Sequence, residues 1–169
     1  SIFRYLKSER INTTPDTIYS YIDAILNSMI VRKCSRYDIK GRKVLKRQEK
    51  YYVADLGLRN HTLNLEKIDY GACFETIVYN QLIANGYEVN IGKIGDYEVD
   101  FIAQRNNKRV YIQVAYLLAN DDIINREFRG LESIIDNYEK IVISNDTFDF
   151  SRNGIKHLNI IDFLMKDIL

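Results

Sequence analysis

The chain has 169 residues, of which 46% are hydrophobic and 28% charged, and its net charge is only +1. This composition is that of a folded chain with one domain or two small ones, and it excludes a proline-rich linker or a disordered tail. No apolar run approaches the roughly 18–20 residues that span a bilayer, and the first ten residues, SIFRYLKSER, lack the long apolar segment of a signal peptide. We therefore expect no membrane partner and take the cytoplasm as the default location.

Charge is unevenly distributed along the chain. Residues 1–60 hold 13 Lys and Arg against six Asp and Glu, whereas residues 61–169 hold 11 against 17. The excess lies between residues 32 and 50, where nine basic residues face two acidic ones: Arg32, Lys33, Arg36, Lys40, Arg42, Lys43, Lys46, Arg47 and Lys50. This density is typical of a polyanion-binding surface, because each neutralised phosphate releases counterions. The alternative is a solvated hairpin that pairs with the acidic second half.

The predicted elements begin with a short helix that ends near residue 12. Thr14-Pro15 then favours a second helix over residues 14–28. Residues 30–37 and 44–54 are rich in strand formers and flank the turn signal Lys40-Gly41, which predicts a hairpin. Two helices and a basic ribbon are parts of a winged helix. The first helix of that fold is missing, so we interpret the chain as a fragment of a longer protein.

The second predicted helix is poorly suited to reading bases. It carries no Lys or Arg between Thr13 and Ser28, and its Asp16 and Asp23 would repel phosphates. We therefore expect DNA contact to come from the basic hairpin and to be non-specific. Tyr37, Tyr51 and Tyr52 lie beside the basic residues and can stack on bases, although tyrosine in a strand more often packs in the core.

A second unit is predicted to follow, with the division at residues 1–62 and 63–169. A helix over residues 70–85 ends at Gly86, and Asn106-Asn107 favours a hairpin turn. The remaining predicted strands are 87–91, 98–103, 110–116 and 140–144, and the remaining predicted helices are 121–138 and 160–169. This order predicts an α/β (α+β) fold with a mixed sheet and flanking helices.

Polar residues on two of these strands form a candidate site. Strand alternation places Glu98, Asp100 and Ile102 on one face, and Tyr111, Gln113 and Ala115 share a face of the next strand. A carboxylate in so apolar a strand needs a partner, since an unpaired buried charge is costly. We expect Asp100 and Gln113 to form a polar cluster with Glu75. The alternative is a hydrogen-bonded buried pair of Asp100 and Gln113 with no chemical role.

Characteristic segments cover most of the chain: residues 37–41 (YDIKG), 50–60 (KYYVADLGLRN), 74–75 (FE), 95–101 (GDYEVDF), 111–116 (YIQVAY) and 154–162 (GIKHLNIID). Through them the chain resembles the domain of unknown function that ends many prokaryotic AAA-type ATPases. The resemblance implies a winged-helix-like segment followed by a PD-(D/E)XK restriction-endonuclease-like domain. It also implies an upstream ATPase domain as the partner that binds ATP, because this chain has no phosphate-binding GxxxxGK[ST] motif.

Active nucleases of the resembled fold place a helix Glu, a strand Asp and a Glu-x-Lys motif around one or two divalent ions. Glu75 and Asp100 match the first two as catalytic and metal-binding positions, whereas Gln113-Val-Ala115 replaces Glu-x-Lys. Gln113 supplies no charge and Ala115 no ammonium, and nothing in the sequence positions Lys93 or Lys108 to compensate. The resemblance thus implies weak Mg²⁺ binding, no resident cofactor and a catalytically degenerate domain.

Three functions remain open on this evidence. The first is non-specific DNA binding by the basic hairpin, with a nuclease-like domain that does not cut. The second is an active Mg²⁺-dependent endonuclease. The third is a protein-interaction or homo-oligomerisation module, in which the hairpin docks on an acidic surface.

Overall fold

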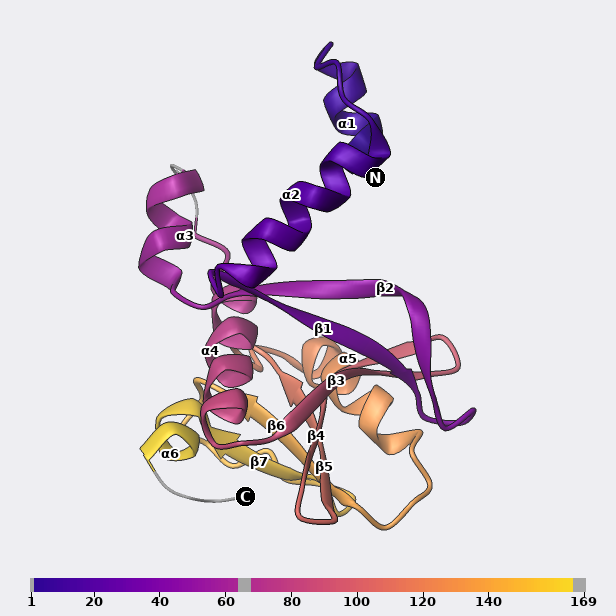
Figure 1. Ribbon diagram of the computed structural model, residues 1–169. Helices are drawn as coiled ribbons and strands as arrows, with labels where there is room; N and C mark the ends of the chain where they lie inside the picture. The colour runs from indigo at the N-terminus through magenta and orange to yellow at the C-terminus, as the bar shows by residue number, and fades with distance from the viewer. Residues whose placement is uncertain (1, 64–67, 166–169) are drawn as a thin grey trace.

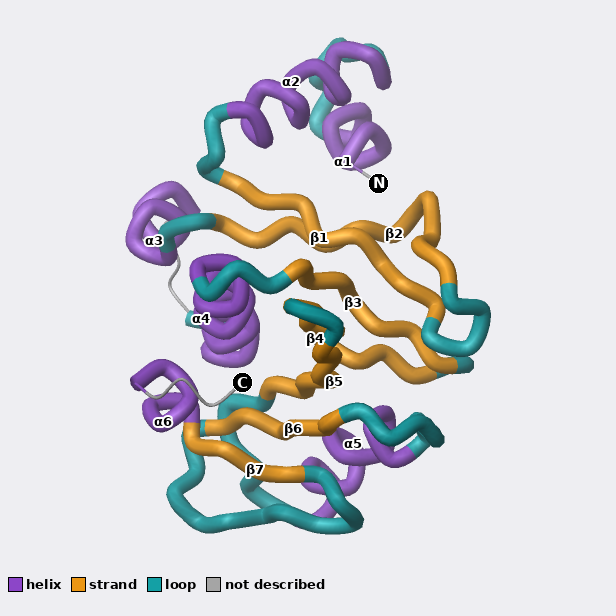
Figure 2. Tube along the Cα trace, turned by 60° about the horizontal axis from the view of Figure 1, so that its bottom comes forward, coloured by secondary structure: helices purple, strands orange, loops and turns teal. Residues whose placement is uncertain are grey.

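The computed structural model describes residues 2–63 and 68–165, which form a seven-stranded mixed sheet with helices on both faces (Figure 1). The strands lie in the order β2-β1-β3-β4-β5-β6-β7 (Figure 2). The predicted mixed sheet with flanking helices is confirmed. None of the helices in these described ranges is long and apolar enough to cross a bilayer.

The N-terminal helices α1 (Ile2–Ser8) and α2 (Pro15–Asn27) project from the β1–β2 end of the sheet (Figure 1). They lead into the predicted hairpin of β1 (Val31–Asp38) and β2 (Lys43–Val53). β1 pairs antiparallel with β2 and parallel with β3, so the hairpin extends the main sheet. One sheet therefore spans both predicted units, and their division at residue 62 stays a prediction.

The turn of this hairpin has a defined geometry. The amide of Gly41 donates to Asp38 Oδ1 at 3.0 Å. A Cβ at Gly41 would lie 2.5 Å from Asp38 Oδ2, so a larger residue there would displace the Asp38 carboxylate. The left-handed backbone conformation falls instead on Arg42, with φ 49°. The turn thus presents Lys40, Arg42 and Lys43 to solvent.

The helices and strands that follow come in the order that the sequence predicts. They are α4 (Tyr70–Ala84), β3 (Glu88–Ile94), β4 (Tyr97–Arg105), β5 (Lys108–Val114), α5 (Asp121–Glu132) and β6 (Glu139–Ser144). Asp69 begins α4 by accepting from the amide of Ala72 at 3.0 Å. Asn106 and Asn107 both have positive φ, which is the backbone twist that a two-residue hairpin turn requires.

Three parts of the chain differ from the predicted elements. Helix α3 (Leu56–Leu63) forms where the sequence predicts no element, and its first turn is fixed by Asp55 Oδ1, which accepts from the amide of Leu58 at 2.7 Å. Helix α5 stops at Glu132, six residues early, and Ile135 beyond it is 98% exposed. Strand β7 (Lys156–Asn159) was not predicted, and α6 (Ile160–Met165) follows it directly. The expected continuation of that helix to residue 169 lies outside the described residues.

Two apolar cores cover the two faces of the sheet. On one face α4 and α6 pack through side chains such as Val78, Leu82 and Phe163. On the other face α5 packs through Phe128 and Leu131, both fully buried. The candidate site lies where the α4 side of the sheet meets the start of α4 and the end of β5.

Candidate functional site

A bulge in β4 sets the direction of Asp100. The two β4 residues Asp100 and Phe101 together oppose the single β3 residue Ile91. Such a bulge interrupts the alternation of side chains between the two faces. Phe101 packs in the α4-side core, whereas Ile102 packs in the α5-side core. The expectation that Glu98, Asp100 and Ile102 share a face is therefore wrong at Ile102.

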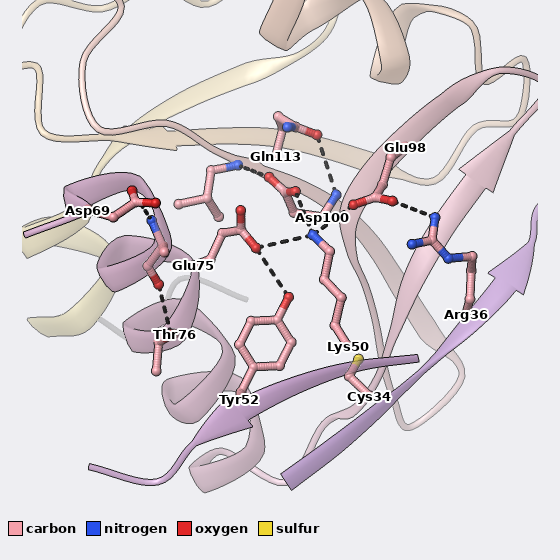
Figure 3. A network of polar contacts seen from close by, with 12 residues as sticks. Cys34, Arg36, Lys50, Tyr52, Asp69, Glu75, Thr76, Glu98, Asp100 and Gln113 are labelled. Atoms are coloured by element: carbon pink, nitrogen blue, oxygen red, sulfur yellow. Dashed lines mark hydrogen bonds and ion pairs between the residues drawn. The ribbon is translucent and has the colours of Figure 1, made fainter. Parts of the chain in front are cut away.

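Lys50 lies at the centre of three carboxylates (Figure 3). Its Nζ is 2.7 Å from Glu98 Oε1, 3.3 Å from Glu75 Oε2 and 3.9 Å from Asp100 Oδ1. The lysine comes from β2, Glu75 from α4, and the other two carboxylates from β4. The Asp100 side chain is only 8% exposed, against 31% for Lys50. We call these four residues the Lys50 cluster.

Backbone and amide groups hold the buried end of this cluster. Asp100 Oδ2 accepts from the amide of Val114 at 2.9 Å, and the Asp100 amide donates to Gln113 Oε1 at 3.4 Å. Gln113 Nε2 donates to Glu127 Oε2 on α5 at 3.0 Å. The expected grouping of Glu75, Asp100 and Gln113 is therefore present, and these three side chains line one cavity of about 550 Å³ together with Glu127.

The electrostatics of the cluster follow from burial and charge. Burial raises the pKa of Asp100 well above its usual value, and the Glu75 charge adds to this effect. Burial alone would lower the pKa of Lys50, but its bond to Glu98 and the charges of Glu75 and Asp100 raise it instead. Burial also opposes ionisation of Glu98, yet Lys50 and Arg36 hold its pKa below the usual value. Lys50 therefore stays charged at neutral pH.

Tyr52 borders the Lys50 cluster on its apolar side. Its hydroxyl donates to Glu75 Oε2 at 3.2 Å, and its ring stacks on Tyr79 with 4.3 Å between centroids. Burial, with the neighbouring Glu75 charge, raises the pKa of Tyr52, so it remains a neutral donor. The ring is 5% exposed and cannot stack on a base.

A second buried network lies at the far edge of the sheet. His157 Nε2 and Ser144 Oγ are 2.8 Å apart, and Ser144 Oγ donates to Asp146 Oδ2 at 2.8 Å. Ser144 is completely buried, so no substrate reaches its hydroxyl. Burial lowers the pKa of His157 despite the nearby charge of Asp146. This network joins β6 to β7 and the loop between them, and we assign it a structural role.

With this geometry in place, comparison with known proteins identifies two regions. Residues 3–69 match a family described as Domain of unknown function (DUF8612), and residues 70–163, more than half of the chain, match Domain of unknown function (DUF4143). The chain belongs to the DUF4143 family. A Haemophilus influenzae protein described as uncharacterized is 35% identical over 162 residues, which are 95% of this chain and 40% of that protein. The chain thus spans less than half of this relative. No solved structure matches.

The DUF4143 region supplies every acidic member of the Lys50 cluster, whereas Lys50 itself comes from the DUF8612 region. The ammonium beside Asp100 therefore comes from β2. Within residues 2–63 and 68–165, no three His, Cys, Asp or Glu side chains are grouped so as to hold a metal. Glu75, Asp100 and the Gln113 amide are oxygen ligands of the kind that Mg²⁺ binds, but the Lys50 ammonium occupies the space that Glu75 and Asp100 share.

Seven of the nine basic residues separate into two groups. Four are engaged: Arg32 Nη1 donates to Asn80 Oδ1 at 3.1 Å, Lys33 pairs with Glu49 at 3.5 Å, Arg36 pairs with Glu98, and Lys50 lies in its cluster. Lys40, Arg42 and Lys43 are exposed and pair with no carboxylate among the described residues. We call these three residues the hairpin tip. The side chains of Lys46 and Arg47 lie outside the described residues.

Sequence reasoning missed Lys50 as a member of the site, and it missed Glu127. Local charge density cannot show that a strand residue faces inward, so Lys50 was grouped with the surface cations. Glu127 did leave a signal, because it interrupts the apolar stripe of Ile124, Phe128 and Leu131 on α5. Both cysteines are buried and free, and burial raises the pKa of Cys34 to about 12.

Proposed function

We propose that this chain binds DNA non-specifically through the hairpin tip, and that its nuclease-like domain is catalytically degenerate. The observation that carries the proposal is the contrast within the basic segment. Arg36 and Lys50 are neutralised by carboxylates of the protein, whereas Lys40, Arg42 and Lys43 remain exposed. Exposed cations on a projecting turn can contact phosphates without reading bases.

The degenerate nuclease assignment is supported by topology and by the Lys50 cluster. The order α4-β3-β4-β5-α5-β6, with Asp100 at a bulge and Gln113 on the adjacent strand, fits a PD-(D/E)XK-like core. In place of a divalent ion, the ammonium of Lys50 neutralises Glu75 and Asp100. An ammonium provides neither the Lewis acidity nor the bound hydroxide that phosphodiester hydrolysis by a metal site requires.

The wider role in this proposal is that of a C-terminal accessory region of an AAA-type ATPase. The motifs quoted from the sequence support this role, and so does the greater length of the Haemophilus influenzae relative. In this arrangement the ATPase binds ATP and the hairpin tip holds the DNA. The tip extends a strand pair of the main sheet, so the proposal does not depend on a separate winged helix.

The test is fluorescence anisotropy of a labelled duplex across a salt series. Changing Lys40, Arg42 and Lys43 to Ala should weaken binding and reduce the slope of log K against log salt by about 2.7, because each lost phosphate contact contributes about 0.9. A matched control changes three exposed cations elsewhere, Lys7, Lys108 and Arg129, to Ala. Equal losses in the two variants, or no binding by the parent chain at low salt, would contradict the proposal.

A second candidate function is a metal-dependent endonuclease, which one observation favours. Lys50 restores the ammonium beside Asp100 that Gln113-Val-Ala115 lacks. Incubation of plasmid with Mg²⁺ or Mn²⁺ separates the two functions, with Asp100→Asn as the control. Cleavage by the parent chain that the substitution abolishes would establish the nuclease, and intact plasmid would support the degenerate domain.

A further inference from the structure

A larger cavity lies on the α5 face of the sheet, away from the Lys50 cluster. Its volume is about 720 Å³, within the roughly 300–1,000 Å³ of small-molecule sites. It lies between the turn of the β1–β2 hairpin and the segment that follows α5. That segment exists because α5 ends at Glu132, which leaves this part of the sheet without a helix above it.

Three tyrosines and an arginine give the cavity an aromatic and cationic character. The guanidinium carbon of Arg109 lies 5.5 Å from the ring centre of Tyr37 and 5.3 Å from that of Tyr138. The Nε of Arg109 is buried and makes no hydrogen bond to any described residue. Tyr111 donates from its hydroxyl to Asp136 Oδ2 at 2.6 Å.

Charge and shape together indicate the class of ligand. Apolar walls come from Ile39, Ile94 and Ile134, all of which are at least partly buried. The cations Lys40, Arg42 and Arg109 face the single carboxylate Asp136 among the lining residues. A flat aromatic group that carries a phosphate satisfies both features, because rings stack on tyrosine while phosphate attracts the cations.

We propose that this cavity accepts an unstacked nucleobase of single-stranded DNA whose phosphates contact the hairpin tip. The inference rests on the proposed DNA binding and specifies its substrate. Lys40 and Arg42 connect the two features, since they belong to the hairpin tip and also line the cavity. A strand held at the tip therefore lies beside the opening. A duplex base would first have to leave its stack, which costs free energy, so single strands are preferred.

The test compares single-stranded and duplex oligonucleotides of one sequence by anisotropy. Tyr138→Ala should weaken single-strand binding by about five- to 160-fold, the range for loss of one stacked base, and leave duplex binding unchanged. Tyr138→Phe should retain the affinity, because the ring remains. Tyr97→Ala is the matched control: Tyr97 is 42% exposed, close to the 46% of Tyr138, and lies outside the cavity.

The outcomes separate this inference from the proposed function. Equal affinity of the parent chain for single strands and duplex would overturn the inference, as would equal losses in Tyr138→Ala and Tyr97→Ala. If the hairpin-tip variant still lost binding, DNA binding itself would stand. Ile135→Glu is a second variant, at a lining residue 98% exposed and therefore tolerant of change. It places a carboxylate at the cavity and should also weaken single-strand binding, and unchanged binding would count against the inference.

Discussion

Replacing Lys50 with Met tests how the buried cluster is stabilised. The substitution keeps the apolar stem and removes the charge that Glu75, Glu98 and Asp100 share. Removing one partner of a buried ion pair costs about 3–5 kcal/mol, whereas exposed pairs contribute about 0–1 kcal/mol. Lys50 is 31% exposed, so an intermediate value applies.

The contacts that the carboxylates keep without Lys50 narrow the expected loss in the free energy of unfolding. Glu98 keeps Arg36 and Glu75 keeps the Tyr52 hydroxyl, so the main loss falls on Asp100, whose side chain is 8% exposed. We expect Lys50→Met to lower the free energy of unfolding by about 2–3 kcal/mol at neutral pH. For a chain of this size that lowers Tm by about 4–12 °C.

Urea unfolding followed by circular dichroism measures the effect. Lys33→Met is the matched control, because Lys33 lies in the same hairpin, is 45% exposed and pairs with Glu49 alone among the described residues, so its loss should stay below about 1 kcal/mol. Asp100→Asn should raise the free energy of unfolding more in the Lys50→Met variant than in the parent chain. The raised pKa of Asp100 means that the folded state binds its proton more tightly than the unfolded chain does. The free energy of unfolding therefore falls as the pH rises and Asp100 ionises. A Lys50→Met loss equal to that of Lys33→Met would refute this reasoning.

Three further predictions concern the same fold. Mn²⁺ should raise the Tm of Lys50→Met and leave the parent unchanged, because the variant frees the oxygens of Glu75 and Asp100 for a cation; equal shifts in both would show that Lys50 does not compete with a metal. Stability should fall as the pH drops below about 6.5, since burial depresses the pKa of His157 and the unfolded chain binds the proton more readily; in denaturation series, His157→Gln should flatten this dependence, and an unchanged profile would assign it to other groups. Asp69→Ala should cost about 1 kcal/mol in chemical denaturation, because it removes the cap of α4, and a neutral result would mean that water replaces the carboxylate.

The sequence predicts the fold well where a pattern is local. The Thr14-Pro15 signal identifies the start of α2, Gly86 marks the end of α4, and the paired asparagines at 106 and 107 mark their hairpin correctly. Local patterns fail where tertiary packing decides. The apolar spacing of α5 continues to Ile135, but the helix ends at Glu132 and leaves Ile135 in solvent. Strand β7 has only four residues, too few for alternation to be distinguished from a loop.

Local patterns also fail to predict the full geometry of the candidate site. Glu75, Asp100 and Gln113 were predicted to meet because their residue types are unusual in apolar elements. The direction of Asp100 depends on a bulge, which exists only once β4 pairs with β3. The role of Lys50 depends on pairing too, since β2 reaches the site only because β1 joins β3 in parallel.

The pairing of strand β1 with β3 limits how this protein can be divided and recombined. Its pairing covers the edge of β3, and the same hairpin brings Lys50 to carboxylates that belong to the DUF4143 region. A DUF4143 region grafted elsewhere without residues 3–69 would carry an open strand edge, which invites aggregation, and a pocket of like charges. The two regions therefore depend on each other for folding, because the charge of Lys50 in one region is balanced by Glu75 and Asp100 in the other.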